Sequence, residues 1–251
     1  MGVSPLTPRK HPWIFSRTAC LGTEILERLG RVEQIPKVYN FQKARIDYLT
    51  EALKESPKRE VCLEVTRWWQ LRKLVLSGSL PMVAMSLSRN LLTKSTPRRP
   101  PELMVIDDFS ELTDQAFSHH GTSWFSHHSD LTEFAKKSES LLSHGLLPVE
   151  TISSHYLAFF TQVFSKWPNV KVIFFVFPTY RESRSEFIHR SRIIRESLAA
   201  ICLIFPLVSV VSAEDIDFTG ALPILDAFPY HFPEEVYDYF VSATGRLFLP
   251  S

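Results

Sequence analysis

The residues best suited to chemistry lie near the two ends of the chain. Cys20 follows a short apolar segment, residues 13–16, and stands at the start of a segment with helical periodicity. A thiol at a helix N-terminus is expected to have a lowered pKa, which makes Cys20 a candidate nucleophile. His231 precedes the last helical segment, and Asp226 lies upstream of it. An imidazole oriented by a carboxylate suits general-base catalysis near neutral pH.

Each of these residues also has a structural interpretation. A lone free cysteine is more often a small buried apolar side chain, and His231 could cap the closing helix or pack among its aromatic neighbours. Ser16 and Thr18 carry hydroxyl groups close to Cys20 and are alternative nucleophiles, although Ser16 is expected to lie still within the strand. A site that binds a ligand without reacting is the remaining alternative.

Other polar side chains are expected at the same edge of a sheet. If the apolar segments are parallel strands, the residues that follow them meet at one edge, where open α/β sheets bind ligands. A carboxylate there could position a hydroxylated substrate or cap the next helix. A guanidinium could hold a carboxylate or phosphate, or lie exposed in a charged helical turn. The candidate substrate-binding residues are Thr18, Asp108, Thr179 and Arg181, with Asp107 beside them.

Two histidine pairs, His119-His120 and His127-His128, suggest a metal site, with Asp130 close by. Neither pair has the i, i+4 spacing that places two ligands on one helix face, and no cysteine joins them. We therefore expect no metal here, but a solvated loop that could act as a lid.

The elements that would hold such a site alternate along the chain. Apolar runs typical of strands cover residues 13–16, 37–41, 103–106, 170–177 and 207–211. The run at 170–177 is the strongest, because a strand covered on both faces must be apolar throughout. Helical patterns cover residues 22–29, 131–143, 151–166, 183–202 and 233–243, and a helical insertion is expected around 42–94. Strands alternating with helices predict one α/β domain over residues 1–251, with a doubly wound, mainly parallel sheet.

The composition limits the classes of partner and compartment. The 251 residues include 28 basic and 27 acidic side chains, for a net charge of +1. That balance favours neither nucleic acid nor a membrane surface as a partner, and it predicts no oligomeric state. The three cysteines are too few for a disulfide framework, and residues 1–10 lack the apolar core of a signal peptide. A cytoplasmic protein is expected.

Two short motifs resemble a known family. Residues 18–26, Thr-Ala-Cys-Leu-Gly-Thr-Glu-Ile-Leu, resemble the first block of the SGNH (GDSL-like) hydrolase superfamily. The nearest branches read Gly-Ser-Cys there: the GSCFA-type domains and the polysaccharide-biosynthesis acyltransferase-like proteins. Residues 231–237, His-Phe-Pro-Glu-Glu-Val-Tyr, resemble the family's ending, a histidine before a short helix that carries an aromatic residue. The resemblance implies a three-layer, flavodoxin-like SGNH-type fold.

The chain departs from that family at the positions that matter for catalysis. Ala19 stands where the family has its serine nucleophile, and Thr18 stands where it has glycine. Asp226 lies five residues before His231 instead of three. No Gly or Asn oxyanion block follows the middle strands, where Asp108 and Thr179 stand instead. An ordinary Ser-His-Asp esterase mechanism is therefore not available to this chain.

Two functions follow from the resemblance. In the first, Cys20 is the nucleophile, His231 the base and Asp226 its orienting carboxylate, in acetyl transfer to or deacetylation of a carbohydrate or glycan precursor. Some acyltransferase-like relatives lack the serine and keep the cysteine, which favours this function. No cofactor is expected, except an acyl donor such as acetyl-CoA for a transferase. In the second, the chain is an inactive SGNH-like protein that binds a glycan or a partner protein through the same edge.

Overall fold

The main sheet of the protein is parallel throughout. The computed structural model describes residues 13–32, 35, 37–41, 44–54, 60–62, 100–119, 123–128, 141–180, 182–213 and 232–248. The strands of this sheet are β1 (Trp13–Arg17), β2 (Lys37–Asn40), β4 (Leu103–Asp107), β8 (Lys171–Phe175) and β9 (Val208–Val211). They lie in the order β2-β1-β4-β8-β9, with every neighbouring pair parallel. This is the flavodoxin-like order, so the predicted α/β class and doubly wound parallel sheet are confirmed.

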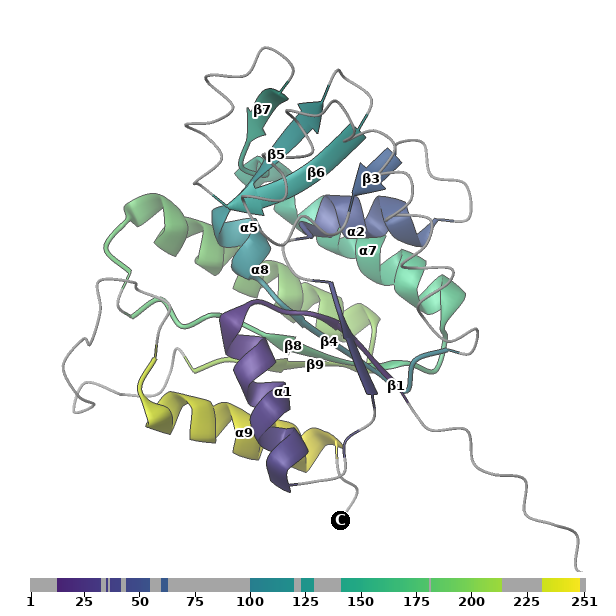
Figure 1. The fold of residues 1–251 in the computed structure, drawn as a ribbon, viewed down its shortest axis with the longest axis vertical. Coiled ribbons are helices and arrows are strands. Elements are labelled where there is room, and N and C mark those ends of the chain that lie inside the picture. Colours follow the sequence, from purple (N-terminus) through teal and green to yellow (C-terminus); the bar gives the residue numbers. More distant parts are fainter. Residues whose placement is uncertain are drawn as a thin grey trace, which may run out of the picture.

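Helices cover both faces of this sheet and complete three layers (Figure 1). On one face lie α1 (Cys20–Val32) and α9 (Glu234–Phe248), which pack together. On the other face α7 (Ile152–Lys166) lies between α2 (Ile46–Leu53) and α8 (Ser185–Ile204), and a short turn of 3-10 helix, Val149–Thr151, leads into α7. Every helix among the described residues is too short or too polar to cross a bilayer.

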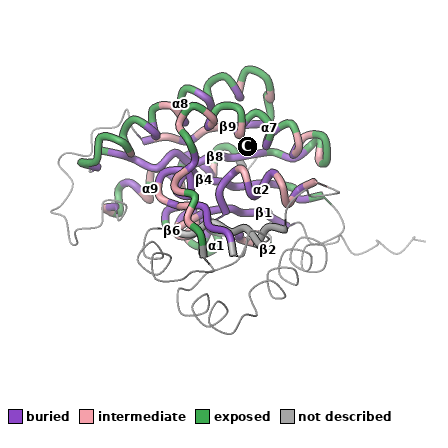
Figure 2. The backbone as a smooth tube through the Cα atoms, turned by 90° about the horizontal axis from the view of Figure 1, so that it is seen from above, coloured by how far each residue is buried: buried purple, intermediate pink, exposed green. Residues whose placement is uncertain are grey.

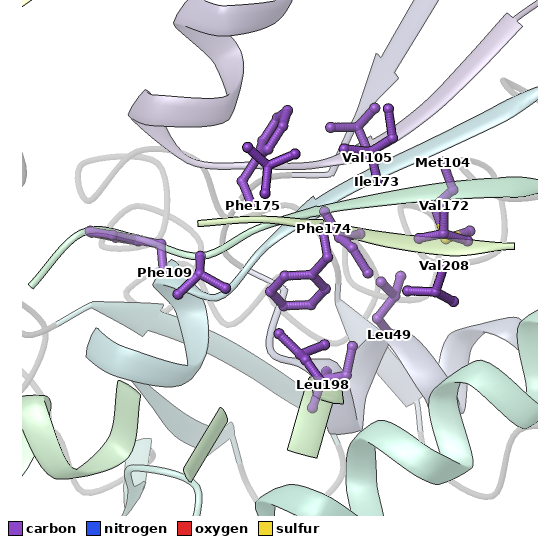
Figure 3. Close-up of a cluster of buried hydrophobic side chains, with 14 of the residues drawn as sticks. Leu49, Met104, Val105, Phe109, Val172, Ile173, Phe174, Phe175, Leu198 and Val208 are labelled. Atoms are coloured by element: carbon purple, nitrogen blue, oxygen red, sulfur yellow. The ribbon is translucent and has the colours of Figure 1, made fainter. Parts of the chain in front are cut away.

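The apolar run of β8 contacts both helical layers. The ring of Phe174 lies 5.6 Å from the ring of Tyr156 on α7, and the ring of Phe175 lies 5.6 Å from the ring of Phe240 on α9. Phe174 and Phe175 therefore project from opposite sides of the sheet (Figure 3). Burial follows the same arrangement, since β1 and β4 are buried throughout and β8 nearly so, while the outward surfaces of α7 and α8 are exposed (Figure 2).

A second, four-stranded sheet was not expected from the sequence. Its strands are β3 (Glu60–Cys62), β5 (Asp114–His119), β6 (Ser123–His128) and β7 (Leu141–Gly145), in the order β3-β6-β5-β7. The short helix α5 (Phe109–Thr113) leads from β4 into β5. The loop predicted around the histidine pairs is wrong, because most of this segment is the antiparallel pair β5 and β6. The three residues between them, His-Gly-Thr, are of the length and composition that favour a hairpin.

Two helical predictions also change. In the helix predicted over residues 131–143, residues 141–143 belong instead to β7, because they pair with β5 in antiparallel register, and residues 131–140 lie outside the described residues. Within the predicted insertion at 42–94, α2 is helical as expected, whereas residues 60–62 form β3 and pair with β6. Residues 63–94 of the insertion lie outside the described residues. The other predicted strands and helices are present with their ends shifted by a few residues.

Candidate active site

The candidate site lies where the strand order of the main sheet reverses. The chain leaves β1 into α1 on one face of the sheet and leaves β4 into α5 on the other, and such a point opens a crevice at the carboxyl ends of the strands. Thr18, Ala19 and Cys20 follow β1, Asp107 is the last residue of β4, and Asp108 follows it. The Ala19 amide donates a hydrogen bond of 2.7 Å to Oδ2 of Asp107, which joins the two strand ends.

Asn40, at the end of β2, holds the turn after β1. Its Oδ1 accepts the Thr18 amide at 3.0 Å, and its Nδ2 donates to the Thr18 carbonyl at 3.1 Å and to the Thr23 hydroxyl at 3.2 Å. The hydroxyls of Ser16 and Thr18 are buried and lie 3.0 Å apart. Cys20, by contrast, is exposed as a residue, although protein atoms lie on most sides of its thiol. No role was predicted for Asn40 from the sequence, although an Asn at the carboxyl end of a strand indicates a candidate site residue.

Asp107 is a buried carboxyl group held by two amides. Besides the Ala19 amide, the Phe109 amide donates to its Oδ1 at 3.3 Å. Burial raises the pKa of Asp107 to about 7, and the Arg17 guanidinium and the two amides oppose that rise. A carboxyl group with this pKa exchanges a proton near neutral pH, so Asp107 is suited to acid–base chemistry.

Asp108 lies deeper and has a different role. Its Oδ1 accepts the Phe177 amide at 2.8 Å, which ties the end of β4 to the end of β8. Its Oδ2 is buried without a hydrogen bond to the part of the chain that the structure describes. Burial raises the pKa of Asp108 well above its usual value. Asp108 occupies the N-cap position of α5, but its side chain makes no capping hydrogen bond.

The expected lowering of the Cys20 pKa is wrong. The pKa of this thiol is raised to about 11, first by the protein packed around it and second by the negative charge of Asp107. Backbone hydrogen bonds in the first turn of α1, from the Leu21 and Cys20 amides, offset only part of the rise. Burial of the thiol and the carboxylate that meets the Ala19 amide together outweigh the backbone hydrogen bonds of the helix N-terminus.

A buried network of hydrogen bonds and one ion pair centred on Glu111 lies next to this site. Glu111 of α5 receives hydrogen bonds from Arg17 Nη1 at 2.9 Å, from the Ile46 amide at 2.6 Å and from the Tyr156 hydroxyl at 3.1 Å. Arg190 of α8 donates to the Glu111 carbonyl at 2.8 Å and 3.0 Å. The network connects β1, α2, α5, α7 and α8, and no motif in the sequence indicated it.

The start of α9 lies against the same edge of the sheet. The Phe232 ring is 6.0 Å from Phe177 and 6.3 Å from Tyr180, both after β8, and 6.3 Å from Tyr237. The guanidinium of Arg28 on α1 lies 4.7 Å from the centre of the Tyr237 ring. Burial and, to a lesser extent, Cys20 raise the pKa of Tyr237, which places its hydroxyl within electrostatic reach of the thiol.

The predicted site residues therefore divide into three groups. Cys20, Thr18 and Asp108 meet at the reversal point, with Thr18 and Asp108 buried beneath it. Thr179 is buried after β8, and its carbonyl accepts the Glu182 amide at 2.9 Å. Arg181, Asp226 and His231 lie outside the described residues, so their roles stay predictions. Among the described residues, no three His, Cys, Asp or Glu side chains gather as a metal site requires.

A cavity of about 160 Å³ lies at the opposite edge of the main sheet. Leu103 and Lys171, at the amino ends of β4 and β8, line it together with Leu247 of α9. Because this cavity is at the other end of the strands from Cys20, it is separate from the candidate site.

Asp107 should give the stability of the protein a distinctive pH dependence. Its pKa rises from the usual 3.8 to about 7 on folding, so between these values the folded chain binds more protons at this group than the unfolded chain does. The contribution of Asp107 to the free energy of unfolding should then fall as the pH rises from about 4 to 7, by up to about 1.4 kcal/mol per pH unit.

Urea denaturation of the wild type and of Asp107→Asn at several pH values between about 5 and 8 measures this dependence. The wild type should lose stability relative to the variant as the pH rises. Parallel stability curves for the two proteins would contradict the raised pKa. Glu102→Gln removes an exposed carboxylate just before the same strand, and its curve should run parallel to the wild type.

Comparison with known proteins assigns no family. No family model matches the chain, and no curated protein matches it. Among solved structures the chain is similar to the salicylyl-acyltransferase SsfX3 from a tetracycline biosynthetic pathway, with 10% identity and a TM-score of 0.43. The match covers 96% of this chain and 55% of that one, so this chain spans about half its length. A likeness at this level supports neither a family nor an activity, and membership of the SGNH superfamily stays a prediction.

Proposed function

We propose that this chain carries out acyl-ester chemistry, as acyl transfer or ester cleavage, on a carbohydrate or glycan precursor. The observation that carries the proposal is the exposed Cys20 thiol at the point where the strand order reverses, beside the buried carboxyl group of Asp107. Ligands of open α/β sheets bind at this kind of position. The resemblance of residues 18–26 and 231–237 to SGNH-type motifs supplies the reaction class and the substrate class.

The reaction would proceed through a thioester. Cys20 Sγ attacks the carbonyl carbon of the ester while His231 takes the thiol proton, and the C–O bond to the leaving alcohol breaks as His231 returns that proton to it. Water or an acceptor hydroxyl then attacks the thioester and gives up a proton through His231, which restores the thiol. Asp226 would orient the imidazole.

The packing of Phe232 supports the assignment of His231. Phe232 follows His231 directly in the sequence, and its ring contacts Tyr180 and Tyr237 at the edge of the sheet that carries Cys20. The exposed ring of Tyr180 and the half-buried ring of Tyr237 present apolar surface that suits the C–H face of a sugar. Polar groups nearby, with Thr179 and Arg181 following β8, would bind its hydroxyls.

The raised pKa of Cys20 favours a second function, binding without turnover. A thiol with a pKa of about 11 is almost wholly protonated at neutral pH, and the thiol is a much weaker nucleophile than the thiolate. Unless a base at the site takes its proton, the edge would bind a glycan or a partner protein without reacting.

Trapping of the acyl group distinguishes these two functions. The full chain is incubated with p-nitrophenyl acetate. Peptide mass spectrometry then locates any acetyl group on the chain and shows whether hydroxylamine removes it. The acyl-ester function predicts an acetyl thioester on Cys20 that is absent from Cys20→Ala and reduced in His231→Ala. Cys202→Ala, which removes a half-buried cysteine from α8, should behave as the wild type.

The opposite result would identify a binding protein. In that case no cysteine carries an acetyl group, p-nitrophenol release does not exceed that of Cys20→Ala, and both proteins bind the same oligosaccharides on a glycan array. The acyl-ester function would then be rejected.

A further inference from the structure

The amide hydrogen-bond donors at the turn before α1 are occupied by side chains of the chain itself. The Thr18 amide donates to Asn40, and the Ala19 amide donates to Oδ2 of Asp107 at 2.7 Å. In acyl-transfer sites, backbone amides at the nucleophile commonly bind the oxyanion that develops on the substrate. Here the Asp107 carboxylate at the end of β4 accepts the hydrogen bond of the Ala19 amide, which is the donor next to Cys20.

The close fit of this contact depends on Gly22. A Cβ atom at position 22 would lie 3.3 Å from Oδ2 of Asp107 and 2.5 Å from the side chain of Thr18. The glycine therefore lets the first turn of α1 approach both residues. The contact between Asp107 and the Ala19 amide therefore helps to hold the start of α1 against the sheet.

We propose that Asp107 restrains this site: its carboxylate occupies the Ala19 amide, and its negative charge opposes the formation of a second negative charge on Cys20. Asp107 is thus a positioning residue that acts through Cys20. The proposal deepens the proposed function and rests on it in taking Cys20 as the reacting group. The restraint itself is measurable on the thiol without any substrate.

The charges around Asp107 explain why it keeps its influence on the thiol. Within the described part of the chain, the ionisable groups that face it are Arg17 from β1, Cys20 from α1, and Asp108 and Glu111 from the segment after β4. The only cation among them, Arg17, is paired with Glu111 at 2.9 Å. Its charge is therefore shared, and the Asp107 carboxylate is only partly neutralised.

Removal of the Asp107 charge should release the thiol. Asp107 has a pKa of about 7, so a proton or a bound cation can neutralise it within the ordinary pH range. Neutralisation lowers the pKa of the neighbouring thiol and weakens the hold of Asp107 on the Ala19 amide. A substrate hydroxyl that donates to Asp107 would leave its charge in place but would compete with the Ala19 amide for the carboxylate.

Alkylation kinetics test this restraint in the full chain. The rate constant for iodoacetamide at Cys20 is measured from about pH 6 to 11, with peptide mass spectrometry to separate Cys20 from Cys62 and Cys202. In the wild type the midpoint of the pH profile should lie near 11. Asp107→Asn keeps an oxygen for the Ala19 amide but removes the charge, so the midpoint should fall by about one pH unit and the rate at about pH 9, where Asp107 of the wild type is ionised, should rise about tenfold.

Glu102→Gln is the matched control, because it removes one carboxylate next to the amino end of the strand that Asp107 ends. Its alkylation profile should equal that of the wild type. An unchanged profile in a folded Asp107→Asn protein overturns the restraint. A wild-type midpoint at or below the ordinary thiol value of about 8.5 also overturns it, and this measurement needs no variant.

The same proteins separate this inference from the proposed function. If the alkylation midpoint shifts but neither protein forms an acetyl thioester, the restraint holds and the acyl-ester function fails. If the thioester forms while the midpoint does not shift, the restraint fails and the function holds.

Discussion

Glu111→Gln is expected to lower the free energy of unfolding by about 3–5 kcal/mol, one of the two largest effects of a single substitution that we predict for this protein. The Glu111 carboxylate is fully buried and pairs with Arg17, whose side chain is 1% exposed. Among the described residues, Nε and Nη2 of Arg17 have no hydrogen-bond partner. Glutamine would leave this buried guanidinium without its paired charge, which is the costly way to break a buried ion pair.

Urea denaturation at neutral pH measures this loss. Glu102→Gln makes the same chemical change at an exposed position and should alter the free energy of unfolding by less than about 0.5 kcal/mol. A loss below about 1 kcal/mol for Glu111→Gln would mean that water or another group compensates Arg17. In that case the ion pair between Glu111 and Arg17 would contribute less to the stability of the protein than we expect.

Gly22→Ala is expected to destabilise the protein by about 2–3 kcal/mol, whereas Gly245→Ala should stabilise it by about 0.5–1 kcal/mol. At position 22 the new methyl group would lie 2.5 Å from Cβ and Cγ2 of Thr18. Thr18 cannot easily move away, because it is buried and its backbone is held by Asn40. At position 245, within α9, a methyl group meets no atom within 4 Å, so only the helix preference of alanine remains.

Thermal and urea unfolding of the two variants should show shifts of opposite sign. The first substitution should also weaken the contact between Asp107 and the Ala19 amide, since α1 must move away from the sheet to accommodate the methyl group. Cys20 alkylation should therefore become faster in Gly22→Ala and stay unchanged in Gly245→Ala. Equal shifts in stability would show that the start of α1 can accommodate a methyl group at position 22 without moving.

The main sheet was predictable because its signals are local. The run from Val170 to Phe177 is apolar except for Lys171, as a strand between two helical layers requires, and Leu103–Ile106 is followed by two carboxylates at the edge where ligands bind. Apolar residues at helical spacing indicated α1 in the same way, and helices were also predicted in the segments that form α7 and α9. The candidate site also follows from this pattern, since residues after parallel strands must share one edge.

The second sheet was missed because its stability is not local. β5 has polar residues at Asp114, Gln115, Ser118 and His119, and without neighbours it has the composition of a loop. It is a strand because β6 pairs with it on one side and β7, distant in the sequence, pairs with it on the other. Backbone hydrogen bonds to a distant partner stabilise a strand without leaving a strong pattern in its own side chains.

The electrostatics of the site were likewise a tertiary property. A cysteine at a helix N-terminus predicts a lowered pKa from the sequence alone, but burial of the thiol and, second, the carboxylate of Asp107 from another strand raise it. Glu111 and Arg17 are 94 residues apart, so nothing in either neighbourhood signals their pairing. The amino-acid sequence by itself determined the class of fold and the edge of the sheet at which the candidate site lies. The tertiary structure decided which charges meet there, because electrostatic energy depends on distance and burial rather than on position along the chain.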